Sequence, residues 1–282
     1  MMLKKTILIL VLVTFVFAGA VQADDHVLKI GATPVPHAEI LEFIKDDLAA
    51  EGIELDIVEF TDYVTPNLAL NDGSIDANYF QHIPYLNQFN SDRGFDLQAV
   101  IKVHIEPIAL YSNEYTSLEE IPAGSSIAVP NDPSNEGRAL LLLHNNGIIT
   151  LDDPTNLSAT PIDIVENPKN LEFEELEAAQ LPRVLPDVAA AVINTNYALE
   201  ADLNPLEDAL IIEGSNSPYV NVVAVKAENE DSEKIETLAK IINSKKVEEF
   251  ILEEYEGAVV PAFEPVDSGE VADVEKTGDY IY

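Results

Sequence analysis

An arginine in a strongly acidic chain is the first group that could do chemistry. Arg138 is one of only three arginines among 282 residues that carry a net charge of −36. It follows the polar segment 131–137 at the predicted start of an apolar helix. Asn, Asp and Ser favour helix N-termini, where unpaired N–H groups and the positive end of the dipole suit an anion. The guanidinium can also pair with a carboxylate through two hydrogen bonds. The pattern indicates a site for a small carboxylate ligand; the alternative is a helix whose arginine bonds a neighbouring acid.

Aromatic and amide side chains are expected beside that arginine, because they follow predicted strands and ligands bind beyond strand ends. A zwitterionic amino acid needs a cation for its carboxylate and acceptors for its ammonium. Aromatic faces would suit an apolar, polarizable side chain, since sulfur–aromatic contacts are favourable. The aromatic candidates are Tyr63, Phe80, His82 and Tyr85, and the amide candidates are Asn194 and Asn221. The alternatives are core packing for Phe80 and Tyr85 and a structural role for His82.

Other chemistries find little support in the sequence. There is no cysteine, and the five histidines form no i, i+4 pair, so no metal site and no cofactor are predicted. The serine segments near 125 and 215 lack the Gly-x-Ser-x-Gly pattern of a nucleophile elbow. The chain is therefore predicted not to be an enzyme. A lyase-type enzyme stays open as a rival, with His82 as its acid/base group.

The acidic composition excludes further classes of partner. Nucleic acid and anionic lipid are themselves polyanionic, so a net charge of −36 argues against both. The scattered acids indicate a solvated surface.

Both ends of the chain differ in composition from the rest. Lys4 and Lys5 precede an apolar run that ends before Ala18, followed by small residues. This is typical of a secretory signal peptide over 1–23, cleaved after Ala23 or Ala20. Without a cysteine for lipid attachment, we expect a soluble protein exported across the inner membrane. Residues 264–282 are predicted to be a disordered acidic tail.

The elements between these ends alternate between short β-branched runs and helical stretches, which is typical of an α/β fold. Predicted strands cover 27–31, 54–60, 75–79, 97–103, 127–129, 162–165, 171–173, 188–193, 209–212 and 219–225. Predicted helices cover 38–50, a short segment after Pro66, 84–93, 136–146, 232–242 and 247–255. Two such sets in succession favour two lobes with a ligand cleft between them.

Several segments carry a specific resemblance. The segments are 60–67, 75–86, 128–135, 165–171, 176–183, 191–195 and 217–221. In this order they resemble the methionine-binding substrate-binding proteins of ABC importers, the NlpA-type lipoprotein family. The resemblance covers the chain from about Val27 to Phe263. The missing lipid-attachment cysteine departs from the family, and a free periplasmic protein fits that departure.

The resemblance implies an α/β, two-lobed periplasmic-binding-protein fold of type II. A hinge of two chain crossings is expected near 104–111 and 217–222. Lobe 1 would comprise 24–108 and 218–263, and lobe 2 would comprise 109–217.

The resemblance also implies a receptor that hands its ligand to a membrane permease with a cytoplasmic ATPase. L-Methionine is the expected ligand; D-methionine, another hydrophobic amino acid or a methionine-containing dipeptide stays open. A monomer is expected. Tyr63, Phe80, His82 and Tyr85 would surround the thioether, Arg138 would hold the carboxylate, and Asn194 and Asn221 would hold the head group. Asn135 is a weaker candidate.

Overall fold

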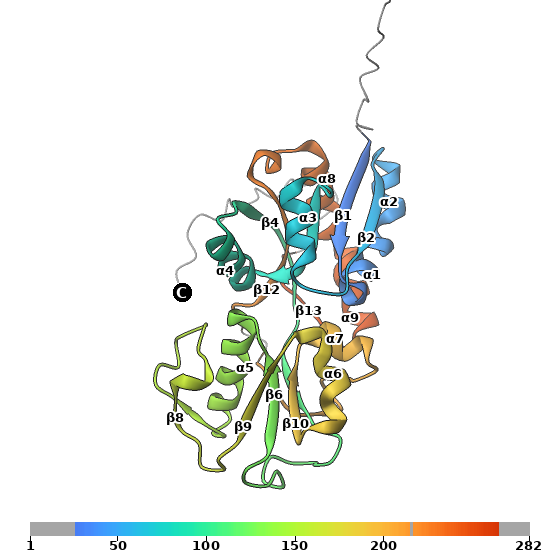
Figure 1. Cartoon of the computed structure of the whole chain (residues 1–282). Helices are drawn as coiled ribbons and strands as arrows, with labels where there is room; N and C mark the ends of the chain where they lie inside the picture. The colour runs from blue at the N-terminus through green and yellow to red at the C-terminus, as the bar shows by residue number, and fades with distance from the viewer. Residues whose placement is uncertain (1–25, 215–216, 265–282) are drawn as a thin grey trace, which may run out of the picture.

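The computed structural model describes residues 26–214 and 217–264. The predicted signal peptide (1–23) and, apart from its first residue, the predicted tail (264–282) lie outside them. Figure 1 shows two lobes stacked one on the other, each built around its own sheet. Within the described residues, no helix is both long and apolar enough to span a bilayer.

The first lobe contains a mixed sheet of six strands in the order β13-β4-β12-β3-β1-β2. Its strands are β1 (Val27–Ala32), β2 (Glu54–Glu59), β3 (Ala77–His82), β4 (Leu97–Ile105), β12 (Val220–Lys226) and β13 (Val260–Pro261). β1 pairs in parallel with β2 and β3, whereas β12 runs antiparallel to β3 and β4. The returning strand β12 is therefore at the centre of a sheet that the N-terminal residues begin.

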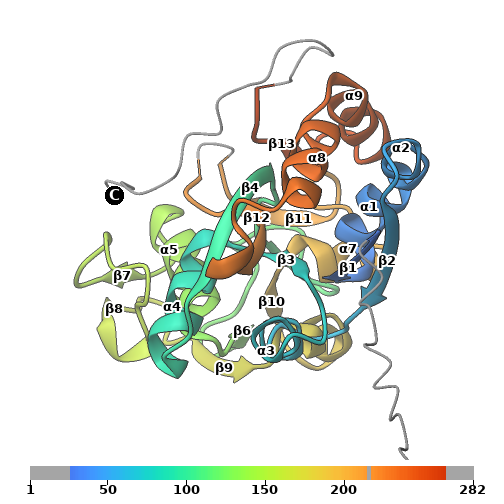
Figure 2. The same cartoon turned by 90° about the horizontal axis from the view of Figure 1, so that it is seen from above.

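Helices cover both faces of this sheet. Figure 2 shows α1 (Glu39–Phe43), α2 (Lys45–Ala50), α8 (Glu233–Ile242) and α9 (Lys245–Glu254) on one side, and α3 (Thr65–Asp72) and α4 (Ile83–Arg93) on the other. Leu238 and Ile251 pack with Leu28 and Val223 on the first side. The apolar faces of strands and helices thus form one core on each side of the sheet.

The second lobe contains a smaller sheet in the order β11-β5-β10-β6-β9. Its strands are β5 (Ala109–Tyr111), β6 (Ser126–Pro130), β9 (Glu172–Leu176), β10 (Ala190–Ile193) and β11 (Ala209–Ile212). Helix α5 (Pro133–Asn145) packs on one face, and α6 (Leu181–Val184) and α7 (Thr195–Glu200) pack on the other. A separate two-stranded sheet joins β7 (Thr150–Leu151) to β8 (Ile164–Glu166).

The chain passes between the two sheets twice. The first crossing joins β4 to β5 through residues 106–108, and the second lies between β11 and β12, where 213–214 and 217–219 are described. The predicted α/β class, the two lobes and the two crossings are confirmed. The lobe boundaries at 108/109 and 217/218 stay a prediction.

Three local differences from the predicted elements matter for the site. The expected helix 38–50 is divided at Ile44, where the backbone has φ −97° and ψ 0°. β3 extends to His82, so Phe80 and His82 lie within a strand instead of after it. The short β5 and α7, which flank the first crossing and the cleft, had no sequence signal of sufficient length. Short elements such as these depend on tertiary contacts rather than on local propensity.

Candidate functional site

A small cleft lies between the lobes. Its lining comprises Tyr63, Phe80, Gln81, His82, Tyr85, Glu106, Asn135, Arg138, Asn194, Thr195, Asn196 and Asn221. All seven predicted site residues and the weaker candidate Asn135 are among them. Their function as ligand contacts stays a prediction, but the structure brings them together from both lobes.

One side of the cleft is aromatic. Tyr63, Phe80 and Tyr85, which we call the aromatic wall, come from the first lobe, and Phe89 packs in the same cluster without lining the cleft. Ring centroids of Tyr63 and Phe80 lie 6.0 Å apart, and those of Phe80 and Tyr85 lie 6.1 Å apart at an interplanar angle of 79°. The hydroxyl of Tyr85 donates to the carbonyl oxygen of Tyr63 at 2.7 Å. These contacts fix the rings as one apolar surface.

His82 connects the aromatic wall to the second lobe. Its Nδ1 accepts from the backbone N–H of Tyr85 at 3.1 Å and thereby caps α4. The proton is therefore assigned to Nε2, which donates to Oδ1 of Asn135 at 3.0 Å. Burial, followed by the nearby Arg138 charge, lowers the pKa of His82 to about 3. His82 is thus a neutral ring whose two nitrogens are both engaged.

The opposite side of the cleft is polar. Glu106, Arg138, Asn194 and Asn196, which we call the polar wall, are all buried. Glu106 lies in the first crossing, Arg138 in α5, and the two asparagines at the start of α7. Residues far apart in sequence therefore meet here.

Arg138 is bound to both chain crossings. Its Nε donates to Oε1 of Glu213 at 3.0 Å, and its Nη2 donates to Oε2 of the same carboxylate. Nη2 also donates to the backbone carbonyl of Glu106 at 2.6 Å. The alternative of an arginine that bonds a protein acid therefore holds. Arg138 also lines the cleft, and no hydrogen bond is found at its Nη1 among the described residues.

The start of α5 differs from the prediction. The helix begins at Pro133, not at Glu136, and Asp132 caps it by accepting from the N–H of Asn135 at 3.0 Å. Arg138 consequently lies in the second turn. The N–H groups at the helix start were expected to be open to an anion, but those of Asn135 and Glu136 both bond Asp132. The guanidinium of Arg138 is therefore the principal anion-binding group that remains from the prediction.

Two asparagines of the polar wall carry buried atoms without a partner among the described residues. These are the acceptor Oδ1 of Asn194 and the donor Nδ2 of Asn196. The other atoms of both amides are engaged: Nδ2 of Asn194 donates to Asn135 Oδ1 at 2.8 Å, and Oδ1 of Asn196 accepts from the hydroxyl of Tyr63. Buried polar groups are normally paired, so such atoms beside a cleft indicate a polar ligand.

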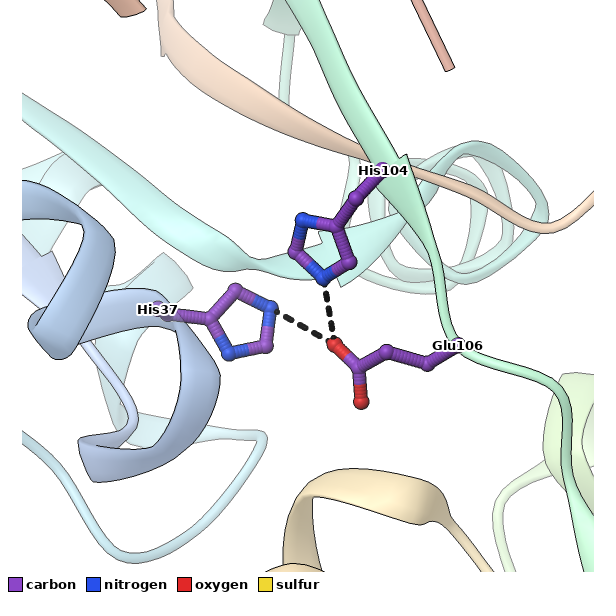
Figure 3. Close-up of side chains that lie close together, drawn as sticks. All are labelled: His37, His104 and Glu106. Carbon is purple, nitrogen blue, oxygen red and sulfur yellow. Dashed lines mark hydrogen bonds and ion pairs between the residues drawn. The ribbon is translucent and has the colours of Figure 1, made fainter. Parts of the chain in front are cut away.

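Glu106 of the polar wall also belongs to a histidine–carboxylate cluster with His37 and His104. Nε2 of His104 and Nε2 of His37 lie 2.7 Å and 3.2 Å from Oε1 of Glu106, as Figure 3 shows. His37 Nε2 is also 3.2 Å from Oδ1 of Asn221. Burial lowers the pKa of His37 to about 4 and of His104 to about 3, so both rings are neutral. One atom from each residue lies within 4.8 Å of the others, close enough in principle for a metal ion.

The sequence reasoning missed Glu106, Asn196 and this cluster. His37 and His104 are 67 positions apart, and no i, i+4 spacing marks them. Glu106 is one of 51 acidic residues. Its position shortly after the predicted strand 97–103, next to Pro107, was the one signal that could have distinguished it.

Comparisons with known proteins show which family the chain resembles over most of its length. A family model described as NlpA lipoprotein matches residues 28–263. The D-methionine-binding lipoprotein MetQ of Escherichia coli K12 is 43% identical over 246 residues, which cover 86% of this chain and 90% of that protein. A nutrient-binding protein of Burkholderia cenocepacia, solved bound to methionine, is 45% identical with a TM-score of 0.81, covering 84% of this chain and 100% of that one. A periplasmic substrate-binding protein of an ABC transporter from Coxiella burnetii is 44% identical with a TM-score of 0.80, covering 83% and 100%.

The names of these relatives bear on one expectation. The family and the Escherichia coli protein are described as lipoproteins. Those names describe the relatives, whereas this sequence has no cysteine, so the free state stays a prediction.

Proposed function

Because the chain belongs to the NlpA lipoprotein family, we propose that it is the extracytoplasmic receptor of an ABC importer and that methionine is its ligand. It would work outside the inner membrane, as a monomer, and deliver methionine to a permease with a cytoplasmic ATPase. The coverage of nearly whole relatives supports the same overall role for the whole chain.

The contrast between the two sides of the cleft carries the proposal. The aromatic wall offers ring faces and edges to an apolar, polarizable side chain, and sulfur in a thioether interacts favourably with such rings. Opposite it, Arg138 offers a cation, and Asn194 Oδ1 offers an acceptor without a partner. A free amino acid with a thioether side chain matches both surfaces.

The proposed mechanism is closure of two lobes on the ligand. Contacts already cross the cleft: the Tyr63 hydroxyl donates to Asn196, and His82 donates to Asn135. A ligand that touches rings of the first lobe and polar groups of the second binds the closed arrangement better than an open one. It therefore shifts the population toward closure, which the permease would recognise.

The rival proposal of an enzyme receives little support from His82. Both of its ring nitrogens are engaged, and a pKa of about 3 makes it a weak base at neutral pH. We therefore propose that the chain binds its ligand without changing it. A rival ligand, such as another hydrophobic amino acid or a methionine-containing dipeptide, remains in the same class of function.

Calorimetry with L-methionine tests the proposal. The exported chain is unfolded and refolded first, so that ligand carried through purification is removed. Saturable 1:1 binding is expected. The same titration with D-methionine, leucine and methionyl dipeptides identifies the preferred ligand. Refolded protein that gives no heat with any of them would contradict the receptor proposal, and release of a new product during the titration would favour the enzyme.

A further inference from the structure

We propose that Glu106 receives the α-ammonium group of the ligand, and that His37 and His104 are positioning residues that hold its carboxylate for this contact. The inference rests on the proposed function and deepens it: it makes a free ammonium group a condition for tight binding. Glu106 was not among the residues predicted from the sequence.

Glu106 is a buried carboxylate with an acceptor position still open. It is 5% exposed and lines the cleft. Oε1 faces Nε2 of both histidines, and Oε2 accepts the backbone N–H of Asn196 at 2.9 Å. A carboxylate offers about four lone-pair positions, of which these contacts fill three. The remaining one belongs to Oε2, on the oxygen that also contacts the second lobe.

The hydrogen bonds of the histidines define which groups donate. The hydroxyls of Thr33 and Tyr79 contact Nδ1 of His37 and Nδ1 of His104. If each hydroxyl donates, each ring carries its proton on Nε2 and donates it to Oε1 of Glu106 (Figure 3). The reverse arrangement fails, because Oε1 can carry one proton at most and could not serve two acceptor nitrogens. With both Nε2 atoms protonated, Glu106 is ionised between two neutral rings, which is the state that the proposal uses.

The local charge favours a cation at this position. The Arg138 guanidinium is paired with Glu213, and it contacts the Glu106 backbone rather than the Glu106 carboxylate. Burial raises the pKa of Glu106, which means that the ionised form is costly unless a positive group compensates it. An ammonium supplies that charge. Asn194 Oδ1, buried and without a partner among the described residues, gives the ammonium a second acceptor in the same cleft.

A metal ion is the competing occupant of the cluster. The distances do not demand one, since every ring nitrogen already has a hydrogen-bond partner and the His104–Glu106 separation of 2.7 Å is an ordinary N–H···O contact. Elemental analysis of the refolded chain after incubation with Zn²⁺ and dialysis separates the two. Stoichiometric zinc that is lost in Glu106→Gln would overturn the proposal.

The closing experiment compares two ligands on two proteins. L-Methionine is titrated against its des-amino analogue, 4-(methylthio)butanoate, with the full chain and with Glu106→Gln, which keeps the size of the side chain. We expect wild type to prefer methionine by at least about 30-fold, the size of effect typical of a buried charge pair, and the variant to lose that preference. An equal loss for both ligands, or a wild type that binds both equally, would overturn the inference and leave the receptor standing. A wild type that binds neither would overturn both.

The positioning role has its own readout. In His104→Leu the donor to Oε1 is lost, and the preference for methionine over the des-amino acid should fall. In His104→Gln an amide N–H can replace the ring donor, so the preference should be restored. A purely structural His104 would instead weaken both ligands equally in His104→Leu, leaving the preference unchanged, and that result would contradict positioning.

Discussion

The aromatic wall and the polar wall face the same cleft but are built in opposite ways. The aromatic wall comes from one stretch of the first lobe, residues 63–85, and its rings contact each other. The polar wall joins Glu106, Arg138, Asn194 and Asn196 from three separate elements, and each of them also bonds a residue outside the polar wall. A surface for an apolar side chain can be built from one stretch of chain, whereas the opposite charges for a zwitterion come here from separate elements.

The comparison predicts the largest loss of binding in the polar wall. In Arg138→Ala, the ligand carboxylate loses its cation and Glu213 loses its partner. We expect methionine affinity to fall by about 2–5 kcal/mol, or roughly 30-fold to several thousand-fold. Calorimetry measures the loss. The exposed Arg183 provides the matched control, since Arg183→Ala removes the same charge far from the cleft lining. Unchanged affinity in Arg138→Ala would remove this residue from the site.

The placement of α5 should be nearly as sensitive. A Cβ on Gly137 would lie 2.3 Å from the carbonyl oxygen of Leu157 and 2.9 Å from the backbone nitrogen of Ala159. Gly137→Ala must therefore displace α5 or the loop, and we expect about 1–3 kcal/mol less stability to urea. Gly214→Ala is the control, because no atom lies within 4 Å of its Cβ position. Equal stability of the two variants would show that the loop with Leu157 and Ala159 moves at little cost and does not fix the position of α5.

The aromatic wall should show a smaller effect that depends on the ligand. Phe80→Ala removes a ring from the side-chain surface, so methionine should weaken by about 1–2 kcal/mol, or roughly 5- to 30-fold. The affinity for alanine, whose methyl side chain is too short to reach the ring, should be nearly unchanged. Phe95→Ala serves as control, because Phe95 packs on the same cluster without lining the cleft. If methionine and alanine weakened alike in Phe80→Ala, the division of labour between the walls would be wrong.

The pH dependence of stability should show whether His104 is neutral in the folded protein. His104 has a pKa lowered to about 3 by burial, against an ordinary value near 6.5. The unfolded chain therefore binds a proton below about pH 6.5 that the folded chain does not. The stability that the neutral His104 allows is fully present above about pH 6.5 and is lost as the pH falls toward its pKa in the folded chain, about 3. Urea denaturation between pH 7 and pH 4 should show a slope shallower by up to about 1.4 kcal/mol per pH unit in His104→Gln. Parallel slopes would mean that His104 is protonated in the fold.

The residues of the aromatic wall were easier to predict from the sequence than those of the polar wall. Tyr63, Phe80, His82 and Tyr85 could be placed together because they follow or end β2 and β3, which lie on either side of β1 in one sheet. Arg138 was identifiable because arginine is rare in this chain. Glu213 as its partner was not, because one acid among 51 carries no distinguishing pattern.

The structure of the polar wall was the least predictable part. The position of Glu106 between His37 and His104 depends on β4 and on the turn at Pro34–Ala38 meeting beside the first crossing, which is a tertiary contact. The split of the predicted helix 38–50 at Ile44 is likewise a tertiary outcome, because the sequence there continues a helical pattern. Local propensity describes the elements, and packing decides where they meet.

The attachment of Arg138 to both crossings has a mechanical consequence. Its bonds to the Glu106 carbonyl and to the Glu213 carboxylate attach both crossings to α5 of the second lobe. A rotation of the lobes that preserves these bonds must bend each connection between the bonded residue and the first-lobe sheet, close to Ile105 and Tyr219. The hinge points would then lie next to the first lobe. A ligand anion bound to the guanidinium would be coupled to both of them through this one side chain.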